Sequence, residues 1–211
     1  MPRLVELDLF ANSISGEIPK GFQNLLLLEK LDLQENELTG SAFPPQIMKL
    51  KRLKSYRISG NSLNAQIPVN IGSLTALEEL WLADNGIDGS IPTQIGRLTS
   101  LTTLAMYENN LKGTIPSELG KLPLEELYLF SNFLGGAIPA ELFDADSMLE
   151  LRLDNNFLQG PLPTQVGKMT DLEDLRLHNN NLSGEIPTDI GFLTELSKFD
   201  FDSYFTSTLL F

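Results

Sequence analysis

The chain has 211 residues, and its 28 acidic against 15 basic side chains give a formal net charge of −13. A surface this acidic repels phosphate backbones and anionic lipid headgroups, which argues against nucleic acid and such membrane surfaces as partners. The absence of cysteine and the single histidine exclude disulfides, thiol nucleophiles and metal sites built from thiolates or several histidines. No apolar run approaches the length of a membrane span, and the N-terminus lacks the apolar core of a signal peptide, so we expect a soluble chain that carries no export signal as written.

One pattern repeats along the whole chain with a period of about 24 residues. Each unit begins L-x-x-L-x-L-x-x-N, as in LEELWLADN, and continues G-x-I-P-x-x-I-G-x-L, as in GSIPTQIGRL. Eight units begin at positions 4, 28, 53, 77, 101, 124, 148 and 172, and a ninth begins at Leu196 but carries Tyr204 where asparagine is expected. A fixed period of this length indicates a solenoid, in which each unit covers the core of its neighbour.

The physical chemistry of each repeated position supports this interpretation. Leucines at a spacing of two lie on one face of a short strand, and stacked units pair such strands in parallel. A short amide at the corner after the strand can satisfy backbone groups that lose their sheet partners there. In the I-P-x-x-I-G segment, we expect proline at the first position of a short helix and glycine just after its end. We interpret these positions as scaffold, including the asparagines Asn12, Asn36, Asn61, Asn85, Asn109, Asn132, Asn156 and Asn180.

These motifs resemble those of the plant-type leucine-rich repeat family, from residue 4 to about residue 200. The resemblance implies an α/β solenoid, a right-handed superhelix with a parallel concave β-sheet and short helical or 3-10 segments on the convex side. We expect one solenoid over residues 1–211, with eight full repeats over 4–195 and a degenerate ninth repeat over 196–211. The resemblance also implies signalling at the cell surface or outside the cell.

Both ends of the array are unusual. Leu4, Leu7 and Leu9 belong to the first strand and have no preceding repeat to cover them, and the cysteine-paired caps of the plant-type relatives are absent. Five of the twelve phenylalanines fall in the last twenty residues, and we expect Phe199 and Phe201 at core positions of the ninth strand. The tail that follows either folds over this strand as a plug or marks a truncated array.

No catalytic constellation stands out in the sequence. His178 has Asp174 and Ser183 near it in sequence, but one strand position does not supply the chain of nucleophile, base and acid that a triad needs. Phosphate-binding glycine loops and protein-kinase motifs are missing, so we expect neither enzymatic activity nor a cofactor. One N-glycosylation sequon, Asn181-Leu182-Ser183, is weak evidence for secretion. An ice-binding face would repeat one small hydroxylated residue, whereas the residue between glycine and isoleucine varies: Glu17, Gln66, Ser90, Thr114, Ala137, Pro161, Glu185.

The residues that differ most between repeats are those at the outward-facing strand positions. Strand alternation turns Trp81 away from the core that its neighbours Leu80 and Leu82 enter. Adjacent repeats add aromatic side chains and then cationic ones to the same concave face, a composition typical of recognition hot spots. The alternative is that aromatics merely favour strands and that the arginines pair with Glu150, Asp154 and Asp174. The candidate ligand-binding residues are Trp81, Tyr107, Tyr128, Phe130, Arg152, Arg176 and His178.

We therefore predict non-enzymatic recognition of a peptide or protein ligand on the concave face. The family resemblance implies the ectodomain, or part of it, of a receptor-like protein or receptor kinase, with a co-receptor as a further partner. One alternative is a secreted inhibitor of a hydrolase, similar to the polygalacturonase inhibitors. Another is a receptor kinase whose catalytic part lies outside this chain.

Overall fold

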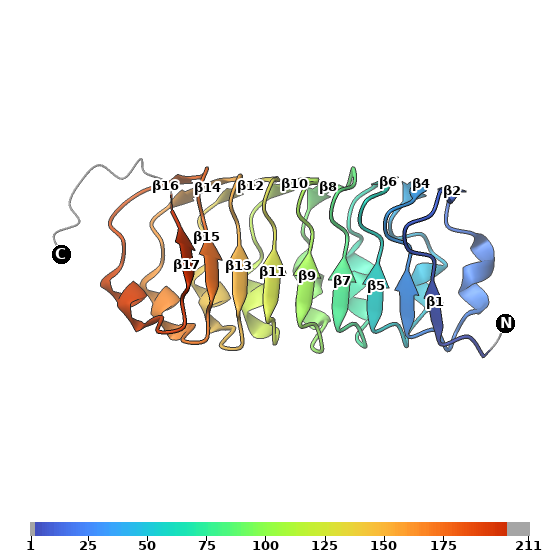
Figure 1. Cartoon of the computed structure of the whole chain (residues 1–211), viewed down its shortest axis with the longest axis horizontal. Helices are drawn as coiled ribbons and strands as arrows, with labels where there is room; N and C mark the ends of the chain where they lie inside the picture. Colours follow the sequence, from blue (N-terminus) through green and yellow to red (C-terminus); the bar gives the residue numbers. More distant parts are fainter. Residues whose placement is uncertain (1–2, 202–211) are drawn as a thin grey trace.

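A computed structural model describes residues 3–201 as a row of stacked repeats, with β1 at one end and β17 at the other (Figure 1). Nine parallel strands follow one another in chain order and form a single sheet. The register is constant along the sheet. The central leucine of one strand pairs with the central apolar residue of the next. The strands are β1 Glu6–Asp8, β3 Lys30–Asp32, β5 Ser55–Arg57, β7 Glu79–Trp81, β9 Thr103–Ala105, β11 Glu126–Tyr128, β13 Glu150–Arg152, β15 Asp174–Arg176 and β17 Lys198–Asp200.

Short 3-10 helices cover the opposite side of the solenoid, as the sequence predicted (Figure 1). In seven of the eight, an extended proline immediately precedes the first helical residue. They are η1 Lys20–Asn24, η2 Ile47–Lys49, η3 Val69–Ser73, η4 Thr93–Arg97, η5 Ser117–Lys121, η6 Ala140–Asp144, η7 Thr164–Lys168 and η8 Thr188–Phe192.

The predicted place of the convex glycine is wrong. Gly72, Gly96 and Gly120 lie inside η3, η4 and η5 rather than after them. Their φ angles are not in the left-handed region, so a helix end is not what selects glycine there. A Cβ at Gly120 would instead overlap the carbonyl of Glu141 in the following helix. The glycine therefore permits close packing of successive helices.

A second set of strands runs along one edge of the repeats, and the sequence pattern did not predict it. One three-stranded sheet contains β2 Ser15–Gly16, β4 Glu37–Ser41 and β6 Ser62–Asn64. One five-stranded sheet contains β8 Asp88–Ser90, β10 Asn110–Gly113, β12 Phe133–Gly136, β14 Phe157–Gly160 and β16 Asn181–Leu182. Between the two sheets, the structure has an isolated bridge from Gln66 to Asp88.

From Asn36 onward, the repeated asparagines bind backbone groups of two repeats, which confirms their scaffold role; Asn12 donates only to carbonyls of its own repeat. The buried Asn109 accepts a hydrogen bond from the Ile87 N–H at 3.0 Å. Its Nδ2 donates to the carbonyls of Leu82, Met106 and Tyr107. The same arrangement recurs at Asn132 and in the other internal repeats.

The two ends of the described chain bury less apolar surface than the middle. Leu4, Leu7 and Leu9 are only partly buried, as expected for a strand without a predecessor. Phe199 pairs with Leu175 at the predicted core position but remains 39% exposed, and Phe201 is partly buried against the core. The proposed plug or truncation after Phe201 falls outside the described residues.

Ala65 occupies a position that seven other repeats give to glycine. It lies four residues after Asn61, one of the repeated asparagines that form a ladder along the solenoid, and its φ is 78°. The glycines at this place, such as Gly89 and Gly113, have φ angles of 78° and 80°. An alanine in this left-handed region carries a steric cost that glycine avoids.

We predict that Ala65→Gly raises the free energy of unfolding by up to about 1 kcal/mol, because relief of the steric cost outweighs the extra chain entropy of glycine. Equilibrium denaturation measures the change. Ala137→Gly is the control, since Ala137 is exposed and has no positive φ, and it should destabilise the chain by about 0.5–1 kcal/mol. A decrease of the same size in both variants would contradict the argument.

We predict that Leu127→Ala lowers the free energy of unfolding by about 2–5 kcal/mol, because it leaves a cavity in the core. Leu127 is fully buried and lies between Leu104 and Leu151 of the neighbouring strands. Chemical denaturation is the measurement, with Lys112→Ala as a control at an exposed position. An unchanged midpoint for Leu127→Ala would show that this register is incorrect.

Candidate functional site

The structure brings the seven candidate residues to one face of the nine-stranded sheet, over strands β7 to β15 or directly after them. Leu80 and Leu82 are fully buried, whereas Trp81 between them is half-buried on the other face. Ala105 on β9 pairs with Trp81 on one side and with Tyr128 on the other. All seven candidate side chains are half-buried, so each offers some of its surface to a ligand.

The aromatic side chains contact one another across the strands. The rings of Tyr107 and Phe130 stack with centroids 4.4 Å apart and an interplanar angle of 7°. Those of Trp81 and Tyr128 lie 6.3 Å apart at 53°, on either side of the buried Ala105. Aromatic pairs of this kind contribute more free energy than the burial of their apolar surface alone provides. The aromatic platform, defined as Trp81, Tyr107, Tyr128 and Phe130, is therefore assembled before any ligand arrives.

Arg152 extends the platform by one layer. Its guanidinium carbon lies 4.0 Å from the centre of the Phe130 ring, which is a cation–π contact. Its Nε lies 3.8 Å from Asp154 Oδ1, too far for a hydrogen bond, and this Nε has no hydrogen-bond partner within residues 3–201. The guanidinium is thus held against the Phe130 ring, and its Nε is buried without a hydrogen-bond partner within residues 3–201, while 25% of the side chain remains exposed.

Arg176 is held differently. Its Nε and a terminal nitrogen both donate to the buried Asp174 carboxylate, each at 3.0 Å. These hydrogen bonds raise the pKa of Arg176 above its ordinary value. Lys198 also lies 3.7 Å from Asp174. The alternative, in which the arginines pair with nearby acids, therefore holds for Arg176 and Asp174, whereas the contact of Arg152 with Asp154 is weak.

His178 lies between two carboxylates from neighbouring repeats. Its Nδ1 is 3.1 Å from Asp200 Oδ2, and its Nε2 is 3.6 Å from Oδ2 of Asp154, which is 2% exposed. These contacts are to acids alone, so the geometry supplies no nucleophile for a triad.

Acidic side chains border the platform on β11 and β13. Glu126 and Glu150 pair across these strands, and the Tyr128 hydroxyl donates to Glu150 at 2.7 Å. Burial raises the pKa of the Glu126 carboxyl above its ordinary value, and the charge of Glu150 raises it further. Burial and the hydrogen bond to Glu150 likewise raise the pKa of Tyr128.

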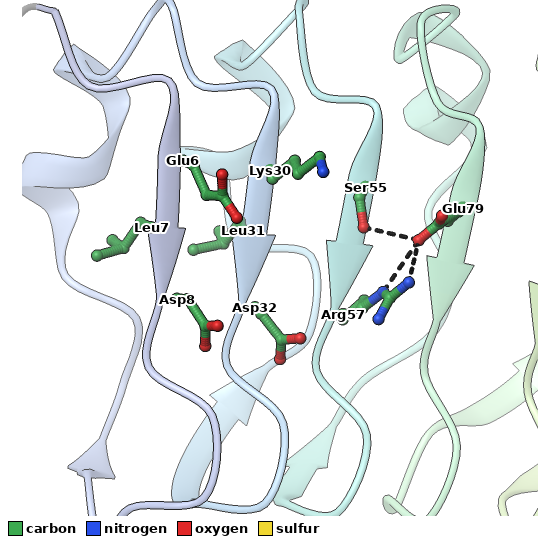
Figure 2. Close-up of a pocket in the computed structure, with 9 residues that line it drawn as sticks. All are labelled: Glu6, Leu7, Asp8, Lys30, Leu31, Asp32, Ser55, Arg57 and Glu79. Atoms are coloured by element: carbon green, nitrogen blue, oxygen red, sulfur yellow. Dashed lines mark hydrogen bonds and ion pairs between the residues drawn. The ribbon is translucent and has the colours of Figure 1, made fainter.

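Arg57 and the hollow beside it were not among the sites predicted from the sequence. Arg57 lies 5.7 Å from the centre of the Trp81 ring and donates from Nε to Glu79 at 3.0 Å. The hollow has a volume of about 180 Å³ over β1, β3, β5 and β7 (Figure 2). Its wall opposite Arg57 holds Asp8 and Asp32, and burial together with Asp8 raises the pKa of Asp32. The position of Arg57 one strand before Trp81 was the signal that could have revealed it.

Residues 3–201 hold no cluster of three or more acidic or histidine side chains suited to a metal ion. Within the same range, no helix is long and apolar enough to cross a lipid bilayer.

Comparison with known proteins identifies the family. A family model described as a leucine-rich repeat region matches residues 3–114, more than half of the chain, and a leucine-rich repeat model matches residues 171–193. The chain is a leucine-rich repeat protein. This confirms the family that the asparagine and leucine spacing suggested.

Solved plant ectodomains resemble this leucine-rich repeat protein over 95% of its length. The ectodomain of the receptor kinase GASSHO1/SCHENGEN3 from Arabidopsis thaliana, in complex with CASPARIAN STRIP INTEGRITY FACTOR 2, is 35% identical with a TM-score of 0.93. The ectodomain of the Arabidopsis receptor kinase HAESA, in complex with an IDA peptide hormone that carries an N-terminal extension, is 36% identical with a TM-score of 0.90. These likenesses confirm the predicted solenoid.

The leucine-rich repeat protein is much shorter than these relatives. It spans 24% and 33% of the two ectodomain chains. The receptor-like protein CLAVATA2 from Arabidopsis thaliana is 39% identical over 70 residues, which are 33% of this chain and 9% of CLAVATA2.

We predict that Glu126→Gln stabilises the leucine-rich repeat protein at pH 7. The raised pKa means that folding disfavours the charged carboxylate, and an amide removes this charge while still accepting a hydrogen bond. The advantage should shrink as the pH falls, because the wild-type carboxyl then becomes protonated in the folded state. Denaturation midpoints at pH 7 and pH 4 measure it, with the exposed Glu125→Gln as control. An advantage that grows towards pH 4 would contradict the sign.

Proposed function

We propose that this leucine-rich repeat protein binds an extended peptide segment on its concave face, without chemical conversion of the ligand. The observation that carries the proposal is the continuous stack of Tyr107, Phe130 and Arg152, in which a preassembled aromatic surface ends in a partly exposed guanidinium that has no close ion pair within residues 3–201. The complex of the HAESA ectodomain with a peptide hormone supports this kind of ligand.

The dimensions of the site suit a short stretch of extended peptide. Four strand spacings of about 4.8 Å separate β7 from β15, roughly 19 Å in all, which an extended segment of about six residues covers. Apolar side chains of the ligand would lie on the aromatic platform. A carboxylate would meet Arg152, where charge-assisted hydrogen bonds form without first breaking a close ion pair.

The two arginines then have different roles. Arg176 already shares two hydrogen bonds with Asp174, and a ligand carboxylate would compete with that acid. His178 has acids as its contacts, so its protonated form would offset their negative charge near an anionic ligand. We assign the ligand's carboxylate to Arg152 and a supporting electrostatic role to Arg176 and His178.

Selection from a random peptide library on the immobilised chain provides a probe peptide. We predict that Trp81→Ala and Phe130→Ala each weaken its binding by about 30-fold, the effect of losing a hot-spot aromatic. Arg152→Gln should weaken binding more than Arg176→Gln. In the wild type, Arg176 is already paired with Asp174 and contributes less to the ligand carboxylate. Calorimetry on folded variants measures the affinities.

Lys112→Ala is the matched control, since Lys112 is exposed on β10 of the five-stranded edge sheet rather than on the nine-stranded sheet. It should bind the probe peptide as the wild type does. Equal affinities for Trp81→Ala, Arg152→Gln and Lys112→Ala would move the binding surface away from the concave face.

A further inference from the structure

The single N-glycosylation sequon lies in an accessible part of the fold. Asn181 begins β16, which is the outermost strand of the five-stranded edge sheet (Figure 1). The side chains of Asn181 and Ser183 are exposed, and Leu182 between them is half-buried. The Asn181 amide makes no side-chain hydrogen bond within residues 3–201. A group attached to this amide would project into solvent without disturbing the core.

Two exposed phenylalanines precede Asn181 at the same repeat position. Phe133 and Phe157 are followed by Asn181 at intervals of 24 residues, and each begins a strand of the edge sheet. Phe133 is 48% exposed and Phe157 is 57% exposed, and their rings lie 6.1 Å apart at an interplanar angle of 19°. Stacked aromatic rings left open to water indicate a surface that something covers.

We propose that Asn181 is an N-glycan acceptor and that the inner sugars of this glycan pack against Phe157 and Phe133. The sequon and the aromatic pair are independent observations that meet at one place on the edge sheet. Asn181 pairs with Gln159, which lies two residues after Phe157 on β14, so a sugar on Asn181 starts on the strand next to that of Phe157. The C–H groups on the flat face of a sugar ring match the electron-rich face of phenylalanine.

Transfer of the glycan to Asn181 is a substitution reaction at the anomeric carbon of its first sugar. Asn181 Nδ2 forms a bond to the anomeric carbon of a lipid-linked oligosaccharide, and the bond from that carbon to the diphosphate oxygen breaks. Nδ2 loses one proton, and the lipid diphosphate leaves with the electron pair. The inference rests on the cell-surface or extracellular setting that the family resemblance implies, because glycan transfer to asparagine takes place in the secretory pathway.

The full chain, fused to a secretion signal and collected from a eukaryotic culture medium, tests the acceptor. Glycopeptide mass spectrometry should show a glycan on Asn181 in the wild type and none in Asn181→Gln. Lys112→Thr is the matched control, because it completes a sequon at the exposed Asn110, which holds the equivalent position of repeat five. An unmodified Asn181 in the secreted chain overturns the assignment, whatever the state of Asn110.

A double-mutant cycle tests the packing. Asn181→Gln should lower the melting temperature of the secreted chain by about 2 °C in the wild type and leave it unchanged in a Phe157→Ala background, since the shared contact is already lost there. Equal shifts in both backgrounds overturn the contact. Affinity for the selected probe peptide should be the same with and without the glycan, because β16 lies outside the concave sheet. Failure of peptide binding and failure of glycosylation are therefore separate results.

Discussion

The side-chain amide of the ladder asparagine is the interaction on which the solenoid depends. It joins a backbone N–H of one repeat to carbonyl groups of that repeat and the next, at the corner where the backbone of both repeats leaves the sheet. Without it, buried carbonyls there would lack partners. Because the amide fixes how far one repeat is displaced from the next, the outward positions of nine strands line up. The aromatic platform is a consequence of this alignment, since Tyr107 and Phe130 stack only if their repeats are in register.

The repeated positions could be predicted from the sequence, whereas most of their side-chain partners could not. Alternation was enough to place Trp81 outside the core, because every other residue of a strand shares a face. The glycine in η5 was misplaced, since its reason is a contact with the next helix and not a local turn. Arg57 was missed because its bond to Glu79 crosses between strands, whereas the pair of Arg176 and Asp174 lies within one.

The concave face combines a rigid centre with a charged surround. Stacking holds the rings of Tyr107 and Phe130 and the guanidinium of Arg152, so binding costs less side-chain entropy than it would with mobile groups. The carboxylates of Glu126 and Glu150 lie close beside these groups and repel other anions. Under the proposed function, a ligand carboxylate would meet Arg152, and this contact would fix the direction in which an extended peptide lies.

The break in the edge sheet gives the solenoid an uneven resistance to bending. Between β6 and β8, an isolated bridge and one hydrogen bond from the Gly86 N–H to the Leu63 carbonyl replace the strand pairing, while β5 and β7 remain fully paired on the concave side. The third and fourth repeats can thus separate along one edge at a lower cost in hydrogen bonds than other neighbours. The hollow spans this joint, because Arg57 of the third repeat and Glu79 of the fourth both line it, and Trp81 follows on the same strand as Glu79. A ligand long enough to touch both the hollow and Trp81 would couple its own binding to the curvature of the whole array.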